Sequence, residues 1–385
     1  MKTRGLFFVI ALLARTALFA QANFSIQYGP YLQNIGEEEV TVVWVTSGDA
    51  LGWVEVAPGD RTHFYAEERP RFFETSNGRR LIGRLHRVTI PGLQKGTTYR
   101  YRVYAREVVD GSRGDVRYGK SVATNPYRTF RFTTLDSSKE GVHFAVVNDI
   151  HGRNDVLESL LKNVEIDDLD FMVFNGDMMS QLDSEELMFN GFLNKSVELF
   201  ASNLPFFFTR GNHETRGPFS TRFMDYFPTS TGLPYYTFRH GPAYFIMLDS
   251  GEDKPDSDIE YGGLAAFDEY RCKQAEWLKE IVSSREFRES PVKIVAIHVP
   301  AFTSTWHGTL HVQELFIPIL NGTGIDLMFC GHTHTHSYLP KGERENDFPI
   351  LTNSNNEILD IVVKGEQIKV KISDHQGKVT KTIDL

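Results

Sequence analysis

The feature that most constrains the fold is a series of apolar runs between residues 142 and 330, separated by segments with helical spacing. The runs are continuous rather than alternating, which is typical of strands buried on both faces. They lie at 142–147, 171–174, 205–209, 244–248, 292–297 and 327–330. Helical spacing occurs at about 155–165, 184–201, 267–284 and 312–320. The pattern predicts an α/β domain in which helices cover buried strands.

Side chains that can ligate a metal ion follow five of these runs directly. They are Asp149, His151, Asp177, Asn212, His298, His332 and His334. In α/β sheets, ligands bind beyond the carboxyl ends of the strands, so we expect the side chains to converge there. Residues two apart on an extended backbone face the same side. The pair at 149 and 151 and the pair at 332 and 334 are therefore each expected to reach one place.

Seven such side chains are too many for a single metal ion that must also react. If one carboxylate bridges two ions, each ion receives four protein ligands and keeps room for a hydroxide and a substrate oxygen. Two divalent ions about 3.5–4 Å apart suit an in-line displacement at phosphorus. Their charge exceeds that of two aspartates, so the centre would attract a phosphate group. These ligand types suit Mn, Fe and Zn alike.

The blocks D-x-H, G-D, G-N-H-E, H and G-H-x-H occur in this order between residues 142 and 337. In this pattern the chain resembles the calcineurin-like metallophosphoesterases. The resemblance implies a four-layer α/β/β/α sandwich over residues 136–385. It also implies hydrolysis of phosphate mono- or diesters by a hydroxide that bridges two divalent or trivalent metal ions.

The same resemblance implies a role for each site residue. One ion would be held by Asp149, His151, Asp177 and His334. The other would be held by Asp177, Asn212, His298 and His332, with Asp177 as the bridge. Asn212 and His213 would bind the substrate phosphate, and His213 would be the catalytic residue that protonates the leaving oxygen.

Residues 24–135 have a different pattern, in which apolar and polar residues alternate. Short strands are expected at 40–46, 85–90, 99–105 and 127–133, with turn signals between them. No helical apolar face is present, so the pattern predicts a β-sandwich over residues 23–135. Part of this segment, 86–101, resembles a fibronectin type III module, in which a tyrosine at the position of Tyr99 caps a sheet corner.

The order of the two domains is similar to that of the purple acid phosphatases, and so is the segment GPYLQ at 29–33. Two residues depart from those enzymes. Ser180 stands where they have a metal-ligating tyrosine, and His151 is a ligand that they lack. The comparison therefore implies a colourless relative without tyrosinate-to-iron charge transfer. It leaves the partner that orients His213 unassigned, with Asp183 and Glu214 as candidates.

Several other features receive a structural rather than a chemical interpretation. Residues 114–121 match the P-loop pattern G-x-x-x-x-G-K-[ST], but another strand follows instead of a helix, so we expect a hairpin loop. The acidic stretch 251–258 is expected to be a solvated loop, with a role in substrate choice as the alternative. Arg210 is expected to be exposed, and nothing in the spacing demands a disulfide between Cys272 and Cys330. Packing or surface roles are expected for His143, His240 and His375.

The first 22 residues contain Lys2 and Arg4, an apolar run and an A-x-A pattern at 20–22. This is typical of a secretory signal peptide, so we expect export to the periplasm or the extracellular space. The net charge of −9 argues against generic nucleic acid binding, and the expected partner is a small phosphoester. No later segment is apolar enough for a transmembrane helix. From a different class, a cell-surface binding protein with a vestigial metal centre is the alternative.

Overall fold

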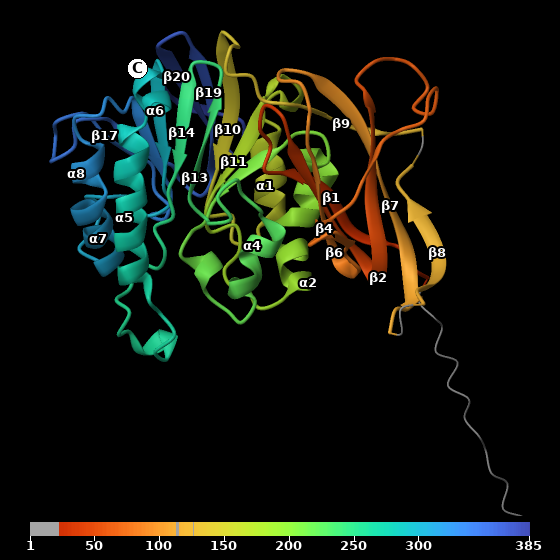
Figure 1. Cartoon of the computed structure of the whole chain (residues 1–385). Helices are drawn as coiled ribbons and strands as arrows, with labels where there is room; N and C mark the ends of the chain where they lie inside the picture. The colour runs from red at the N-terminus through yellow and green to blue at the C-terminus, as the bar shows by residue number, and fades with distance from the viewer. Residues whose placement is uncertain (1–22, 113–114, 126) are drawn as a thin grey trace, which may run out of the picture.

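The computed structural model describes residues 23–112, 115–125 and 127–385, so the expected signal peptide at 1–22 lies outside the described residues. Within these ranges, no helix combines the length and apolarity needed to cross a membrane. A strand-rich sandwich is followed by a larger domain of two sheets with helices outside them (Figure 1). The expected fold class is therefore confirmed, whereas the domain boundary between residues 135 and 136 stays a prediction.

A single long strand organises the sandwich. Strand β2 (Val40–Pro58) pairs through its first half with β1 (Ile26–Gln33) and β6 (Gly83–Ile90), and through its second half with β7 (Thr98–Asp110). The remaining strands of this region are β3 (Arg71–Phe72), β4 (Thr75–Ser76), β5 (Arg79–Arg80), β8 (Arg117–Ala123) and β9 (Phe130–Thr133). Trp44 is fully buried and stacks on His86 with ring centroids 4.8 Å apart.

The sequence pattern found most of these strands but not their full length. The strand expected at 40–46 continues to Pro58, because the polar segment 47–49 interrupts the alternation without ending the strand. The strand expected at 127–133 begins only at Phe130. Tyr99 lies at a corner, as expected, and its hydroxyl accepts the backbone N–H of Gln94 at 3.0 Å.

The P-loop-like segment lies in a hairpin. Its residues 117–121 belong to β8, which pairs antiparallel with β7, and Gly114 lies outside the described residues. Lys120 is on the strand and donates from Nζ to Asn23 Oδ1 at 2.8 Å. The next element is strand β9 rather than a helix, so the setting of a nucleotide-binding P-loop is missing.

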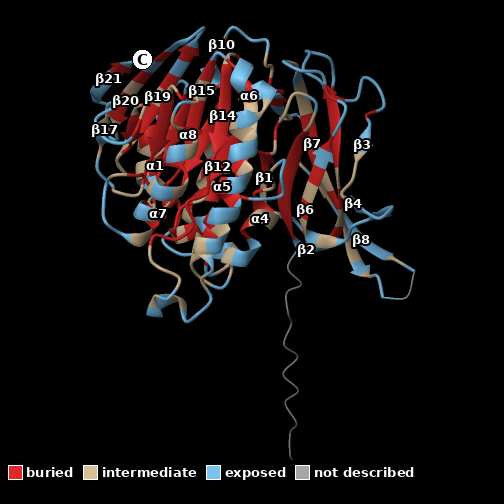
Figure 2. Cartoon of the chain, turned by 60° about the vertical axis from the view of Figure 1, so that its left-hand side comes forward, coloured by how far each residue is buried: buried red, intermediate tan, exposed pale blue. Residues whose placement is uncertain are grey.

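Two six-stranded sheets pack face to face in the larger domain (Figure 2). The first has the order β12-β11-β10-β19-β20-β21, and its strands are β10 (Gly141–Val147), β11 (Phe171–Asn175), β12 (Phe206–Thr209), β19 (Glu357–Lys364), β20 (Gln367–Asp374) and β21 (Val379–Asp384). The second has the order β13-β14-β15-β16-β18-β17, and its strands are β13 (Tyr236–His240), β14 (Ala243–Met247), β15 (Val292–Ala296), β16 (Leu327–Cys330), β17 (Ser337–Leu339) and β18 (Ile350–Thr352). Phe144 and Phe245 meet between the sheets, with ring centroids 5.3 Å apart.

Helices cover the outer face of each sheet. The first sheet is covered by α1 (Asn154–Leu161) and by the helical segment α2 (Glu185–Met188), η2 (Phe189–Leu193), α3 (Asn194–Ser196) and η3 (Val197–Ala201). The second is covered by α5 (Phe267–Ser283), α6 (Arg285–Glu289), α7 (His307–Leu315) and α8 (Ile317–Leu320). Short helical turns are η1 (Ile166–Asp168), η4 (His213–Thr215), η5 (Ser220–Arg222), α4 (Phe223–Tyr226) and η6 (Ile259–Tyr261). The result is the expected α/β/β/α arrangement.

The parallel strands of both sheets end at one edge of the domain. Strands β10, β11 and β12 are parallel in the first sheet, and β14, β15 and β16 are parallel in the second. These six strands are the six apolar runs of the sequence. The pattern did not predict β19, β20 and β21, of which β19 lies antiparallel beside β10.

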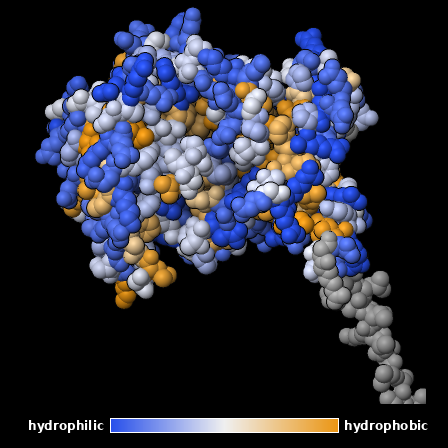
Figure 3. Space-filling model, in the orientation of Figure 1, coloured by the Kyte–Doolittle hydropathy of each residue, from blue (hydrophilic) through white to orange (hydrophobic). Residues whose placement is uncertain are grey.

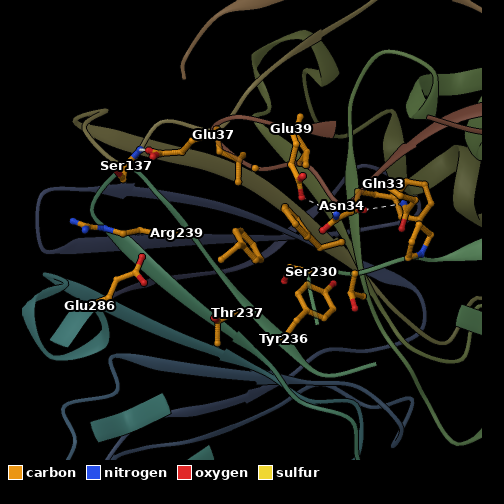
Figure 4. A pocket seen from close by; sticks show the side chains of 18 residues that line it. Gln33, Asn34, Glu37, Glu39, Ser137, Ser230, Tyr236, Thr237, Arg239 and Glu286 are labelled. Carbon is orange, nitrogen blue, oxygen red and sulfur yellow. Dashed lines mark hydrogen bonds between the residues drawn. The ribbon is translucent and has the colours of Figure 1, made fainter. Parts of the chain in front are cut away.

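The GPYLQ segment of the sandwich makes hydrogen bonds to the larger domain. The Tyr31 hydroxyl donates to the carbonyl oxygen of Tyr226 at 2.9 Å, and the Gln33 amide donates to that of Phe206 at 3.1 Å. Beside this junction lies a cavity of about 240 Å³, lined among others by Asn34 and Thr237 (Figure 4). None of the seven candidate ligands lines this cavity, so it is separate from the candidate site.

A hydrogen bond between strands β10 and β19 makes the stability depend on pH. His143 Nε2 lies 2.6 Å from Asp360 Oδ1, and this hydrogen bond raises the pKa of His143 above its ordinary value. A raised folded-state pKa stabilises the fold below the unfolded value, and this gain is lost as the pH rises through the folded value.

We therefore expect His143→Gln to lower the free energy of unfolding by about 1 kcal/mol at about pH 5.5, and by less at about pH 8.5. Urea denaturation at the two pH values measures both losses. His375→Gln, at an exposed histidine, is the control. Equal losses at the two pH values would contradict the assignment.

Candidate metal centre

The seven candidate ligands lie at the shared edge of the two sheets and face one another. The first sheet supplies Asp149, His151, Asp177 and Asn212, from the loops after β10, β11 and β12. The second sheet supplies His298, His332 and His334, from the loops after β15 and β16. The structure thus brings together residues that are up to 185 positions apart in the chain, as the sequence predicted.

Five of the seven candidate ligands have a left-handed backbone. Their φ angles are 53° at Asp149, 49° at His151, 55° at Asp177, 70° at His332 and 58° at His334. Non-glycine residues seldom adopt this conformation, and strain of this kind concentrates at functional sites. Each pair converges as expected, but the expectation of an extended backbone is wrong. Sharp turns after the strands direct these side chains to the site instead.

Asp149 is the centre of the first group of candidate ligands. Its Oδ2 accepts the backbone N–H of His332 at 2.8 Å. Its Oδ1 is buried and has no hydrogen-bond partner among the described residues, although His334 Nε2 lies 3.2 Å away and His151 Nε2 lies 3.8 Å away. These two imidazole nitrogens are 3.1 Å from each other. A buried carboxylate oxygen without a donor, facing imidazole nitrogens, fits a bound cation.

Asp177 belongs to the second group and lies next to the first. Its Oδ2 is 3.0 Å from His298 Nε2. The side-chain amide nitrogen of Asn212 donates to Asp177 Oδ2 at 3.2 Å and to His332 Nδ1 at 3.1 Å, and its oxygen accepts from Arg216 at 3.1 Å. Ligand atoms of Asp177 and His151 also lie within one close set. Asp177 is therefore placed to serve both groups.

Two motif glycines are required because ligand side chains occupy the space of their missing Cβ atoms. A Cβ on Gly176 would lie 2.4 Å from His298 Nδ1, and one on Gly211 would lie 2.2 Å from Asp177 Oδ1. Both contacts are closer than packed atoms tolerate. The glycines of the G-D and G-N-H blocks therefore permit the close packing of the site.

Glu214 holds the loop that carries Asp177. Its buried carboxylate accepts the backbone N–H groups of Asp177 at 2.8 Å, Met178 at 2.8 Å, Met179 at 3.3 Å and Gly211 at 2.9 Å. Charged acceptors make strong hydrogen bonds to backbone donors. The glutamate of the G-N-H-E block thus fixes two candidate ligand loops to each other, a role that its residue type alone does not indicate.

His213 is oriented by a backbone group. Its Nδ1 donates to the carbonyl oxygen of Ser180 at 2.6 Å, which leaves Nε2 facing Asp177 Oδ2 at 3.9 Å. Glu214 holds backbone N–H groups, and Asp183 accepts from the Gln181 side chain at 2.7 Å. Both candidate partners from the sequence are therefore wrong. A backbone carbonyl leaves no signal in residue types that could have revealed it.

The charges of the site favour a cation. Burial lowers the pKa of His298, but the neighbouring charges of Asp177 and Asp149 outweigh burial and raise it to about 10. Burial alone would raise the pKa of Asp149, yet the nearby imidazoles hold it well below its usual range. Burial and the proximity of His298 lower the pKa of His332 to about 4, and burial also lowers that of His213. Two ionised carboxylates, together with imidazoles that are all neutral once a cation replaces the proton on His298, form a donor set that suits Mn, Fe or Zn.

The acidic stretch after β14 is not solvated at its start, contrary to expectation. Glu252 and Asp253 are 0% and 2% exposed, and Asp253 Oδ2 lies 3.7 Å from His332 Nε2. Arg210 is paired with the buried Asp249 at 2.6 Å rather than being a free surface residue. Beyond residue 253 the loop protrudes at the lower left of Figure 3, where hydrophobic side chains lie on the surface. Ile259 and Leu264 of this loop are exposed.

A second cluster of ligand types already contains an internal cation. Asp268, His307 and His311 lie close together, but Arg271 donates to Asp268 Oδ1 at 2.7 Å and to His311 Nδ1 at 2.9 Å. The guanidinium takes the place that a metal ion would need. Both cysteines are free, with Cys330 buried and Cys272 exposed.

The four donors held by Glu214 generate a prediction about stability. We expect Glu214→Gln to lower the free energy of unfolding by about 3 kcal/mol, because an amide nitrogen cannot accept the N–H groups that one carboxylate oxygen now accepts. Urea denaturation measures the loss. Glu186→Gln, at an exposed glutamate, should be neutral. A Glu214→Gln protein as stable as the wild type would show that the carboxylate is not needed to fix these loops.

Two family models match this chain. Residues 142–336 match the calcineurin-like phosphoesterase model, and residues 28–134 match the purple acid phosphatase N-terminal domain. Purple acid phosphatase 22 of Arabidopsis thaliana is 25% identical over 273 residues, which are 66% of this chain and 53% of that protein. Acid phosphatase type 7 of Mus musculus is 26% identical over 339 residues, which are 80% of this chain and 70% of that protein.

The match to purple acid phosphatase 22 spans only about half the length of that relative. The calcineurin-like model, however, covers half of this chain and includes every ligand loop described above. The chain therefore belongs to the calcineurin-like phosphoesterase family.

Proposed function

We propose that this protein is an exported phosphoesterase that uses two metal ions to hydrolyse phosphate mono- or diesters. The observation that carries the proposal is the convergence of seven ligand side chains around two buried carboxylates, one of which has an oxygen without a donor among the described residues. Members of this family use dinuclear metal centres. The phosphatases among its relatives support phosphoester hydrolysis.

Each ion is assigned four ligands in this proposal. Asp149, His151, Asp177 and His334 would hold one ion, and Asp177, Asn212, His298 and His332 would hold the other. The position of Asp177 next to both groups supports its role as the bridge. When bound, two such ions would activate a water molecule and neutralise charge on the phosphoryl oxygens.

His213 is the residue proposed to act on the leaving group. Its Nδ1 is fixed by Ser180, and its side chain is 27% exposed, so Nε2 is accessible to a substrate. With Nε2 protonated, the imidazolium would bind the phosphoryl group and donate the proton to the departing oxygen. Asn212, the neighbouring residue, is proposed to contact the same phosphoryl group.

Two further parts of the proposal rest on the sequence. Ser180 replaces the tyrosine that gives purple acid phosphatases their colour, so the loaded protein should lack a tyrosinate charge-transfer band. The pattern at residues 1–22 supports export.

Release of nitrophenol from p-nitrophenyl phosphate and from bis(p-nitrophenyl) phosphate tests the activity. Metal-free protein should be inactive, and addition of Mn²⁺, Zn²⁺ or Fe²⁺ should restore turnover of at least one ester. The ratio of the two rates separates a monoesterase from a diesterase. No turnover of either ester with any of these metals would contradict the proposal and favour a binding protein.

Two variants separate metal binding from proton transfer. Asp177→Ala should lose both bound metal and turnover, because it removes the shared ligand. His213→Ala should retain the metal while its kcat falls by about 10²–10⁴-fold. Metal analysis and steady-state kinetics measure both effects, with His375→Ala as the matched control. A wild-type kcat in His213→Ala would show that His213 is not the proton donor.

A further inference from the structure

We propose that Asp253, held by Arg216 and Glu252, is a positioning residue for His332 and thereby for the ion that His332 and Asn212 would share. The inference rests on the proposed function, because it concerns the ligands of one proposed ion. Asp253 is not a ligand in that proposal. It acts through His332, from a loop that the sequence predicted to be solvated.

The imidazole of His332 lies between Asp253 and Asn212. Its Nδ1 is 3.1 Å from the side-chain amide of Asn212, and its Nε2 is 3.7 Å from Asp253 Oδ2. A neutral imidazole has one nitrogen with a lone pair and one with a proton. If Nδ1 is to bind a cation beside Asn212, the proton must be on Nε2. A carboxylate on the Nε2 side favours this tautomer.

In two other histidines of the site, a hydrogen-bond partner determines which ring nitrogen carries the proton. His298 Nδ1 faces the carbonyl oxygen of Asn175 at 2.7 Å, and His213 Nδ1 faces that of Ser180 at 2.6 Å. For His332, Asp253 stands in the position of such a partner. The long Asp253–His332 distance makes the effect mainly one of charge.

Asp253 is itself fixed by charged and backbone contacts. Arg216 contacts Glu252 with two nitrogens, at 2.8 Å and 2.7 Å, and reaches Asp253 Oδ1 at 3.3 Å. The carbonyl oxygen of Asp253 accepts the backbone N–H of Gly308 at 2.7 Å. A Cβ on Gly308 would lie 2.6 Å from Asp253 Cα, so the start of helix α7 packs directly on this residue.

The composition of this cluster favours a role beyond stability. Burying charges costs desolvation energy, and apolar replacements of buried ion pairs are often as stable. Here the carboxylates of Glu252 and Asp253 share the guanidinium of Arg216. Burial and the neighbouring Glu252 raise the pKa of Asp253 to about 7. Its carboxyl group nevertheless lies on the Nε2 side of the ring of a proposed metal ligand, where it would strengthen binding of a cation by the opposite nitrogen.

Calorimetric titration of the metal-free protein with Mn²⁺ tests the inference. The wild type should bind two ions per chain. Asp253→Asn keeps the size of the side chain and removes its charge, and we expect the affinity for one of the two ions to fall by about 10–100-fold. The affinity for the other ion and the melting temperature of the metal-free protein should stay the same. This selective loss would not follow from a merely structural role.

Glu260→Gln removes one charge from the same loop, where Glu260 pairs with Lys254, and should behave as the wild type. Asp253→Ser, which is smaller and cannot clash, is the second variant and should show the same selective loss. If the wild type binds two ions and both Asp253 variants bind them equally tightly, the inference is overturned. If the wild type binds fewer than two ions, the proposed function fails first, and this inference with it.

Discussion

The structure depends on two aspartates that are buried at the meeting edge of two sheets. Asp149 and Asp177 are 0% and 1% exposed, and each is surrounded by imidazoles from the opposite sheet or from a neighbouring loop. Two carboxylates at such a place would repel each other and lose their hydration unless positive charge compensates them. The proton on His298 does so in part. Metal ions held by the surrounding candidate ligands would do so fully.

Much of this arrangement could be predicted from the sequence, because it follows from strand order. The six apolar runs became six parallel strands, and parallel strands end at the same edge. Residues such as Asp149 and His298, which follow different strands, had to meet there. The blocks of residue types then named the candidate ligands. The C-terminal strands carried no comparable signal, so β19 beside β10 could not have been predicted.

What the sequence could not predict depends on backbone geometry and on backbone atoms. The left-handed turns at His332 and His334 are invisible to an argument based on spacing. The Ser180 carbonyl that orients His213 has no residue-type signature. The acidic stretch looked solvated because charged residues usually are, yet Arg216 pairs with Glu252 and draws the start of the loop into the site. In each case a local contact, rather than a pattern, decides the outcome.

The most direct test of the account is a crystal structure of the protein soaked with Mn²⁺, with anomalous scattering used to locate the metal. The account predicts two anomalous peaks about 3.5–4 Å apart, one on each side of the Asp177 carboxylate. A single peak, or peaks away from the seven side chains, would contradict it.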